Sequence, residues 1–133
     1  MEALLLRVVD GDLDAVEAYL KYNGDPNAVF MHRGRHHSLL EVAAASGNEA
    51  LAELLLQRGA VVDLQVEEGN TALMHATYLN HPAVVRRLLR AGANATLRNT
   101  LGESALWIAK AEDHAECVEA FRQHVKESVV AGR

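Results

Sequence analysis

A period of 33 residues constrains the fold of this chain more than any other feature of its sequence. The step separates three leucines and three alanines: Leu40, Leu73 and Leu106, and Ala43, Ala76 and Ala109. Two pairs of glycines keep the same step, Gly59 with Gly92 and Gly69 with Gly102. Repeats of this length are supersecondary units that stack, because no unit can bury its apolar face alone. We therefore expect a solenoid of similar units.

Each unit is predicted to contain two short helices. In the middle unit, apolar side chains recur at steps of three and four on both sides of a polar break, with Leu73 and Ala76 before it and Val84, Val85 and Leu88 after it. This spacing is typical of amphipathic helices. We expect the paired helices to share a core that runs along the array rather than one central core.

Hydroxyl side chains predict where the first helix of each unit begins. Ser38, Thr71 and Ser104 stand directly before the apolar pattern, where a side-chain oxygen can accept from a free backbone N–H. The stretch from Ser38 to Glu41 also has the form of a capping box, in which both side chains bond to the helix start.

The second helices are also bounded by residues with defined roles. Asn48 is a candidate N-cap, and Pro82 suits the first turn of a helix, where its missing N–H costs nothing. We expect Gly59 and Gly92 to end two of these helices, because glycine readily adopts the left-handed conformation found there.

Composition limits the class of protein. The chain has 133 residues, half of them apolar, which suits one folded domain, and its formal charge of −5 argues against a chain built to neutralise phosphates. The single cysteine, Cys117, cannot form an intramolecular disulfide and indicates a reducing compartment. Its first residues lack the pattern of a signal peptide or a membrane span, so we expect a cytoplasmic or nuclear protein that does not associate with membranes.

The repeats resemble those of ankyrin repeat proteins. The family pattern G-x-T-P-L-H-x-A-A appears as GNTALMHAT in residues 69–77, and its continuation appears as VVRRLLRAGAN in residues 84–94. This likeness covers nearly the whole chain. It implies an all-α solenoid of stacked antiparallel helix pairs with hairpin-like finger loops. The single domain 1–133 would then comprise an N-terminal capping repeat at about 1–33, repeats at 34–66 and 67–99, and a C-terminal capping repeat at 100–133.

Several positions depart from the family pattern. Glu41, Met74 and Trp107 stand where the family has a histidine. In the last unit Arg122 replaces a core leucine, and we expect residues 116–130 to form a closing helix with Cys117, Val118, Phe121 and Val125 on its packed side. A solenoid needs such a helix because its end must present a polar outer face.

The resemblance implies binding on the concave surface made by the fingers and the first helices. We predict a non-catalytic module that binds another protein or a peptide segment, with Tyr78 and Leu79 as its anchor and Glu67, Glu68 and Glu103 selecting basic residues. Trp107 either adds to this face or packs between first helices. The candidate binding residues are Arg33, Arg35, His37, Glu67, Glu68, Asn70, Tyr78, Leu79, Thr100, Leu101, Glu103, Trp107 and Glu112.

We expect neither an enzyme nor a cofactor, because no catalytic or phosphate-binding motif occurs. His75 aligns with apolar positions and is interpreted as a core histidine bonded to the backbone, with a pH-responsive or ligand-binding role as the alternative. His81 and His114 are expected to cap and pack. Cys117 is interpreted as a small buried apolar residue. The arginines of the middle unit, Arg86, Arg87 and Arg90, are expected on a solvated outer face.

The stretch MHRGRHHS, residues 31–38, is interpreted as an enlarged first finger, three residues longer than the next one. Its basic residues leave an alternative function open, in which Arg33, Arg35, His36 and His37 bind a nucleic acid or a phosphorylated ligand. We expect no metal at its histidines, since they show no fixed helical or strand spacing and no cysteine or close carboxylate completes a tetrahedral set of ligands. We expect the chain to be monomeric by itself. A nucleic acid is not the partner that we expect.

Overall fold

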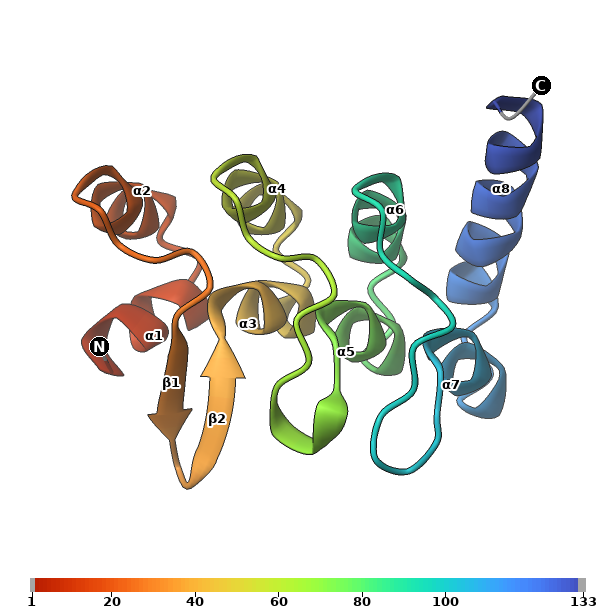
Figure 1. Cartoon of the computed structure of the whole chain (residues 1–133), viewed down its shortest axis with the longest axis horizontal. Helices are drawn as coiled ribbons and strands as arrows, with labels where there is room; N and C mark the ends of the chain where they lie inside the picture. Colours follow the sequence, from red (N-terminus) through yellow and green to blue (C-terminus); the bar gives the residue numbers. More distant parts are fainter. Residues whose placement is uncertain (1, 132–133) are drawn as a thin grey trace.

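The computed structural model describes residues 2–131 and contains four stacked helix pairs (Figure 1). The first helices of the pairs are α1 (Glu2–Val9), α3 (Leu39–Ser46), α5 (Ala72–Tyr78) and α7 (Ala105–Ala111). The second helices are α2 (Leu13–Lys21), α4 (Glu49–Gln57), α6 (Pro82–Arg90) and α8 (Ala115–Ala131). The predicted helical solenoid is confirmed.

The core runs along the array, as predicted. First helices contact neighbouring first helices, and second helices contact neighbouring second helices. One continuous cluster of buried side chains extends from Val8 and Val16 in the first pair to Cys117 and Phe121 in the last. The repeated alanines, such as Ala43, are buried within it, and their small side chains let the first helices approach closely.

The predicted caps of the first helices are present. The side chains of Ser38, Thr71 and Ser104 accept hydrogen bonds from the backbone N–H three residues on, at 3.0, 3.2 and 3.2 Å. The capping box at Ser38 is only half formed. Glu41 turns instead toward His37, whose Nδ1 lies 3.0 Å from its Oε1.

The second helices begin and end close to the predicted residues. Asn48 caps α4 by accepting from the N–H of Leu51, and Gly59 and Gly92 have φ of 97° and 94°. The expected cap by His81 is wrong. Its ring reaches back to the preceding pair, where Nε2 lies 3.1 Å from the carbonyl oxygen of Ala45.

A second histidine makes the same kind of contact. Nε2 of His114 lies 3.0 Å from the carbonyl oxygen of Tyr78, so both rings tie one helix pair to the next. The unpaired carbonyls at the end of a helix supply the acceptors. These histidines therefore brace the stack.

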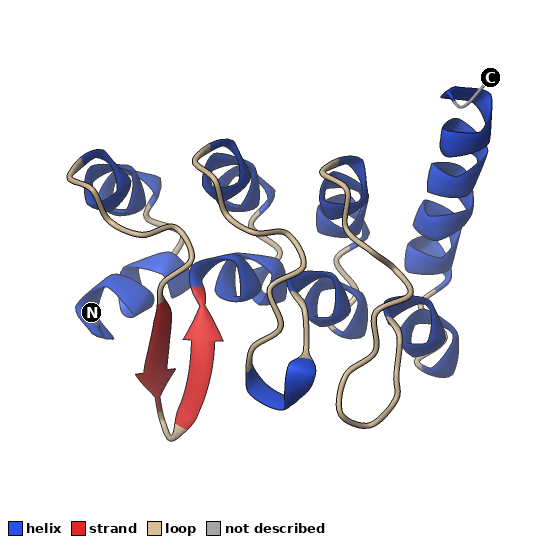
Figure 2. Cartoon of the chain, viewed as in Figure 1, coloured by secondary structure: helices blue, strands red, loops and turns tan. Residues whose placement is uncertain are grey.

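Three fingers connect the helix pairs (Figure 2). The first is a β-hairpin of β1 (Val29–His32) and β2 (Arg35–Ser38), joined by Arg33 and Gly34, which both have positive φ. The second contains the 3-10 turn η1 (Glu67–Gly69), and the third closes through an antiparallel bridge between Arg98 and Ser104. The hairpin holds three histidines, His32 in β1 and His36 and His37 in β2.

The last helix differs in part from its prediction. Helix α8 begins one residue before the expected start, and Cys117 and Phe121 are buried on its inner side. Val125 was placed on that side too, yet it is 60% exposed. Gln123, His124 and Glu127 of α8 line a small hollow together with residues of α6, and Val125 is not part of that lining. Within the described part of the chain, no helix has the length and apolar character needed to cross a membrane.

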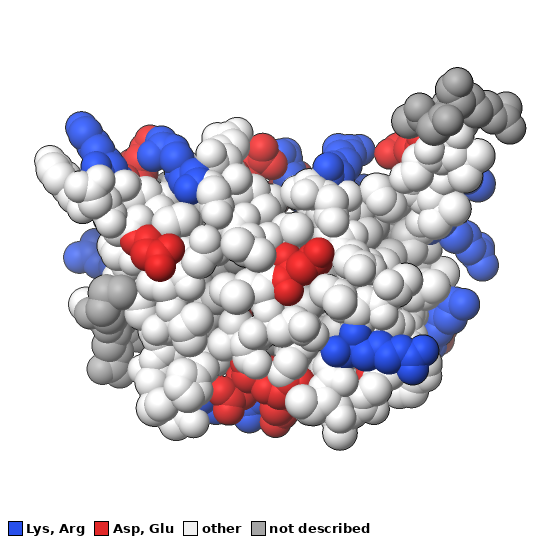
Figure 3. All heavy atoms as spheres, viewed as in Figure 1, with Lys and Arg blue, Asp and Glu red and all other residues white. Residues whose placement is uncertain are grey.

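Charged side chains of both signs alternate along the upper edge of the molecule, over α2, α4 and α6 (Figure 3). Arg86 and Arg90 of α6 are exposed, as expected. Arg87 differs, because its Nε lies 2.7 Å from Oε1 of Glu49 and its Nη1 lies 2.9 Å from Oε2 of Glu53. It joins α6 to α4 across the repeat boundary.

Candidate functional site

A hollow of about 500 Å³ lies between the second and third fingers and the helices α5 and α7. Eight of the thirteen residues predicted to bind a partner line it: Glu68, Asn70, Tyr78, Leu79, Leu101, Glu103, Trp107 and Glu112. We call this hollow the groove. Four residues that are not among those thirteen complete its lining: Met74, His75, Asn99 and Ile108.

Apolar side chains that stay in contact with solvent surround the groove. Tyr78 is 56% exposed, Leu79 45%, Leu101 76% and Trp107 54%. Met74 and Ile108 are buried beneath them and form part of the core. The alternative in which Trp107 packs between first helices is therefore wrong. A cluster of large exposed apolar side chains, rather than isolated ones, is typical of interaction sites.

The third finger is held against the second by Asn99. Its Nδ2 lies 2.9 Å both from Oδ1 of Asn70 and from Oε1 of Glu103, and its Oδ1 accepts from the backbone N–H of Leu101 and Glu103. The backbone N–H of Thr100 also donates to the carbonyl oxygen of Glu68 at 2.9 Å. Thr100 thus braces the fingers and does not line the groove.

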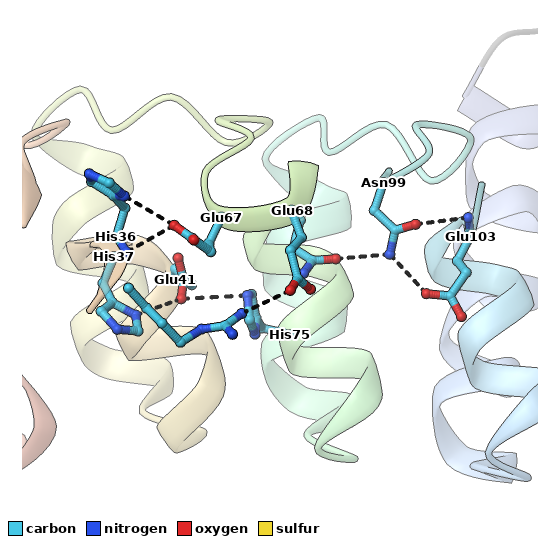
Figure 4. A network of polar contacts seen from close by, with 10 residues as sticks. His36, His37, Glu41, Glu67, Glu68, His75, Asn99 and Glu103 are labelled. Carbon is cyan, nitrogen blue, oxygen red and sulfur yellow. Dashed lines mark hydrogen bonds and ion pairs between the residues drawn. The ribbon is translucent and has the colours of Figure 1, made fainter. Parts of the chain in front are cut away.

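The basic first finger contacts the acidic second finger (Figure 4). Glu67 Oε2 accepts from the backbone N–H of His36 at 3.0 Å and lies 3.1 Å from Nδ1 of the same residue. Both hydrogen bonds lower the pKa of Glu67, and the bond from the backbone N–H of His36 has the larger effect. Arg35 Nη2 lies 3.6 Å from Oε1 of Glu68. Acidic side chains gather at this lower edge (Figure 3), and part of their charge is matched within the chain.

A buried glutamate lies between two histidines at the base of the first finger (Figure 4). Oε1 of Glu41 is 3.0 Å from Nδ1 of His37 and 3.5 Å from Nε2 of His75. Its other oxygen, Oε2, is buried and has no hydrogen-bond partner among residues 2–131. Glu41 stands at one of the positions where the family has a histidine, so a carboxylate between histidines replaces that side chain here.

His75 differs from its prediction. It was expected to bond to the backbone in the core, but it faces Glu41 and lines the groove, with 26% of its side chain exposed. Burial lowers the pKa of His75, and the nearby Glu41 opposes that shift without cancelling it. The ring is therefore neutral near pH 7. Cys117 agrees with its prediction, since it is fully buried and burial raises the pKa of its thiol.

The remaining predicted residues lie outside the groove. Arg33 is at the exposed tip of the hairpin, while Arg35, His37 and Glu67 lie along the junction of the first two fingers. Two carboxylates do lie near histidines of the first finger, Glu67 beside His36 and Glu41 beside His37. Within residues 2–131, no three histidine, cysteine or acidic side chains are arranged to hold a metal ion.

Comparison with known proteins identifies the family. The family model described as ankyrin repeats (3 copies) matches residues 4–99. The Oryza sativa subsp. japonica protein named "Probable E3 ubiquitin-protein ligase XBOS32" is 38% identical over 119 residues, which cover 88% of this chain and 24% of that protein. The Arabidopsis thaliana E3 ubiquitin-protein ligase XBAT33 is 37% identical over 119 residues, 88% of this chain and 23% of that protein.

A bacterial protein is also similar. An ankyrin repeat-containing protein of Treponema pallidum (strain Nichols) is 35% identical over 109 residues, 81% of this chain and 36% of its own length. The chain thus spans about a quarter of the length of the plant relatives and about a third of the bacterial one. With the family model matching most of its residues and the helix pairs in register, the chain belongs to the ankyrin repeat family.

Proposed function

We propose that the chain is a non-catalytic module that binds a segment of another protein in the groove. Ankyrin repeats are generally modules of protein–protein interaction, and the plant and bacterial relatives share these repeats with the chain. The observation that carries the proposal is the cluster of exposed Tyr78, Leu79, Leu101 and Trp107 around one hollow. Aromatic anchors in a pocket with a polar rim are typical of the centre of an interface.

The fixed conformation of the second and third fingers supports the same proposal. Asn99 and the backbone bond from Thr100 to Glu68 fix the third finger against the second before any partner arrives. Binding to a site that is already ordered loses less conformational entropy. The helices α5 and α7 pack against each other and form the other wall, which carries Tyr78 and Trp107.

The alternative of a nucleic-acid or phosphorylated ligand has less support. Arg35 and His36, two of its four candidate residues, contact Glu68 and Glu67. A phosphate would have to compete with those carboxylates and approach their negative charge. Affinity for such a ligand would fall steeply with salt, which distinguishes it from a largely apolar contact.

The test compares two exposed tyrosines. Tyr78 lines the groove, whereas Tyr22, 78% exposed, follows α2 and lies outside the groove lining. The parent chain, Tyr78→Ala and Tyr22→Ala are used as bait in a native extract, and bound proteins are identified and then tested in purified form. The proposal expects a partner that the parent and Tyr22→Ala retain and that Tyr78→Ala loses, with both variants folded by circular dichroism. Equal retention by both variants would contradict it.

A further inference from the structure

The charged residues that line the groove all carry the same sign. They are Glu68, Glu103 and Glu112, and no lysine or arginine of the described chain joins them in the lining. His75 adds no positive charge near pH 7, because burial lowers its pKa. The groove therefore presents an excess of negative charge beside its aromatic side chains.

The three carboxylates differ in how far the chain itself satisfies them. Glu68 has Arg35 at 3.6 Å, and Glu103 accepts a hydrogen bond from Asn99 at 2.9 Å. Glu112 is exposed and has no ion-pair or hydrogen-bond partner for its side chain among residues 2–131. It also stands at the C-cap of α7, where the last carbonyls carry partial negative charge. A cation at this end of the groove would relieve both sources of repulsion.

The aromatic side chains favour the same kind of ligand. Tyr78 and Trp107 are both more than half exposed, and ring faces attract cations, tryptophan most strongly. Lysine and arginine also have aliphatic stems that pack on apolar surface while the charged head stays near water or a carboxylate. Leu79 and Leu101 supply such a surface in the same lining.

We infer that the groove takes one long cationic side chain, lysine or arginine, from the bound segment, with its stem against Tyr78 and Trp107 and its charged head at Glu103 and Glu112. This inference rests on the proposed function and adds the chemistry of the partner to it. An acidic side chain would meet three carboxylates there. A purely apolar one would remove water from those carboxylates without giving them a partner.

Trp107 provides a direct readout, since it is the only tryptophan of the chain and lines the groove. Its fluorescence is titrated with three short capped alanine peptides that differ at one central position, which holds lysine, norleucine or glutamate. We expect the lysine peptide to half-saturate the change at a concentration about tenfold below the norleucine peptide, as a cation at a ring and a carboxylate predicts. The glutamate peptide should give the weakest response.

Charge-neutral variants locate the cation. Glu103→Gln and Glu112→Gln should each reduce the advantage of lysine over norleucine, and Glu116→Gln on α8, the matched control outside the groove, should leave it unchanged. A lysine peptide that binds no better than norleucine, or changes no fluorescence, overturns the inference. If Tyr78→Ala then still loses its partner, the proposed function stands without the cation. A lysine advantage that survives in both variants also overturns the inference.

Discussion

Oε1 of Glu41 lies 3.5 Å from Nε2 of His75, although the two residues belong to different repeats. Glu41 is 6% exposed in α3, while His75 sits on α5 and also lines the groove. The contact therefore links the base of the first finger to the wall of the groove. Oε2 of Glu41 stays buried without a hydrogen-bond partner in the described part of the chain, which costs free energy because the oxygen has lost its water.

Replacing Glu41 by methionine is expected to stabilise the fold. Met74 stands at the matching position of the next repeat and is buried, so a methionine fits this environment. Removing an incompletely paired buried carboxylate while keeping its volume should raise the free energy of unfolding by about 1 kcal/mol. Urea denaturation at pH 7 measures the change. The exposed Glu116→Met controls for lost charge, and a lower stability of Glu41→Met would show that its histidine contacts outweigh its desolvation.

Stability is expected to fall on acidification because of His75. Burial lowers its pKa in the folded chain below the value of 6.5 typical of an exposed histidine, against the pull of Glu41 and together with repulsion from His37 and Arg35. The unfolded chain therefore takes up this proton at a higher pH than the folded chain does. The contribution of His75 is complete above about pH 6.5 and is lost as pH falls through its folded-state pKa.

The test is the pH dependence of urea denaturation between pH 7 and the onset of carboxylate titration. His75→Gln, which keeps a donor for Glu41, should flatten the loss of stability relative to the parent chain. His124→Gln on α8 is the control for the loss of a histidine outside this contact. If the free energy of unfolding of His75→Gln falls with pH as steeply as that of the parent chain, protonation of this ring does not destabilise the fold.

Features set by local sequence could be predicted, and contacts between repeats could not. The period of 33 residues and the hydroxyl caps predict the helices correctly, since both depend on residues a few positions apart. Tyr78 and Leu79 were placed on an exposed face because the repeat register fixes which side of a helix looks outward. The groove follows from that register.

The cluster of His37, Glu41 and His75 could not be predicted by such reasoning. Its members come from β2, α3 and α5, and only the packing of one repeat on the next brings them together. The resemblance implied a hairpin-like first finger, but the paired strands of this hairpin were not predicted, for another reason. Its turn residues, Arg33 and Gly34, are not the Asn-Gly or Asp-Gly pair that usually indicates a two-residue turn.

Arg87 is expected to stabilise the stack through its two glutamates. It contacts Glu49 and Glu53 of the preceding repeat, and the hydrogen bond from Arg87 is the main reason that the pKa of Glu53 is lowered. All three side chains are more than a third exposed, so the effect should be small and sensitive to salt. Arg87→Met should lower the melting temperature at low salt and lose most of that difference at high salt. Arg86→Met, whose side chain has no ion pair within the described chain, is the control. If the melting temperature of Arg87→Met stays below that of the parent chain at high salt, the Arg87 side chain stabilises the stack by packing and not by charge.

Asn99→Ala is expected to loosen the third finger while leaving the helices intact. Asn99 makes two hydrogen bonds through Nδ2 and two through Oδ1, and the latter satisfy the N–H groups of Leu101 and Glu103. Hydrogen exchange should therefore accelerate at those two amides, and the free energy of unfolding should fall by about 1–2 kcal/mol.

Asn94→Ala is the matched control. Asn94 caps a turn in the same way by accepting from Thr96, but it is exposed and lies outside the groove. If Asn99→Ala leaves exchange at Leu101 unchanged, backbone contacts such as that between Thr100 and Glu68 are sufficient to order the finger.

The lysine peptide should also bind Asn99→Ala more weakly than the parent chain, because the carboxylate of Glu103 loses the donor that positions it.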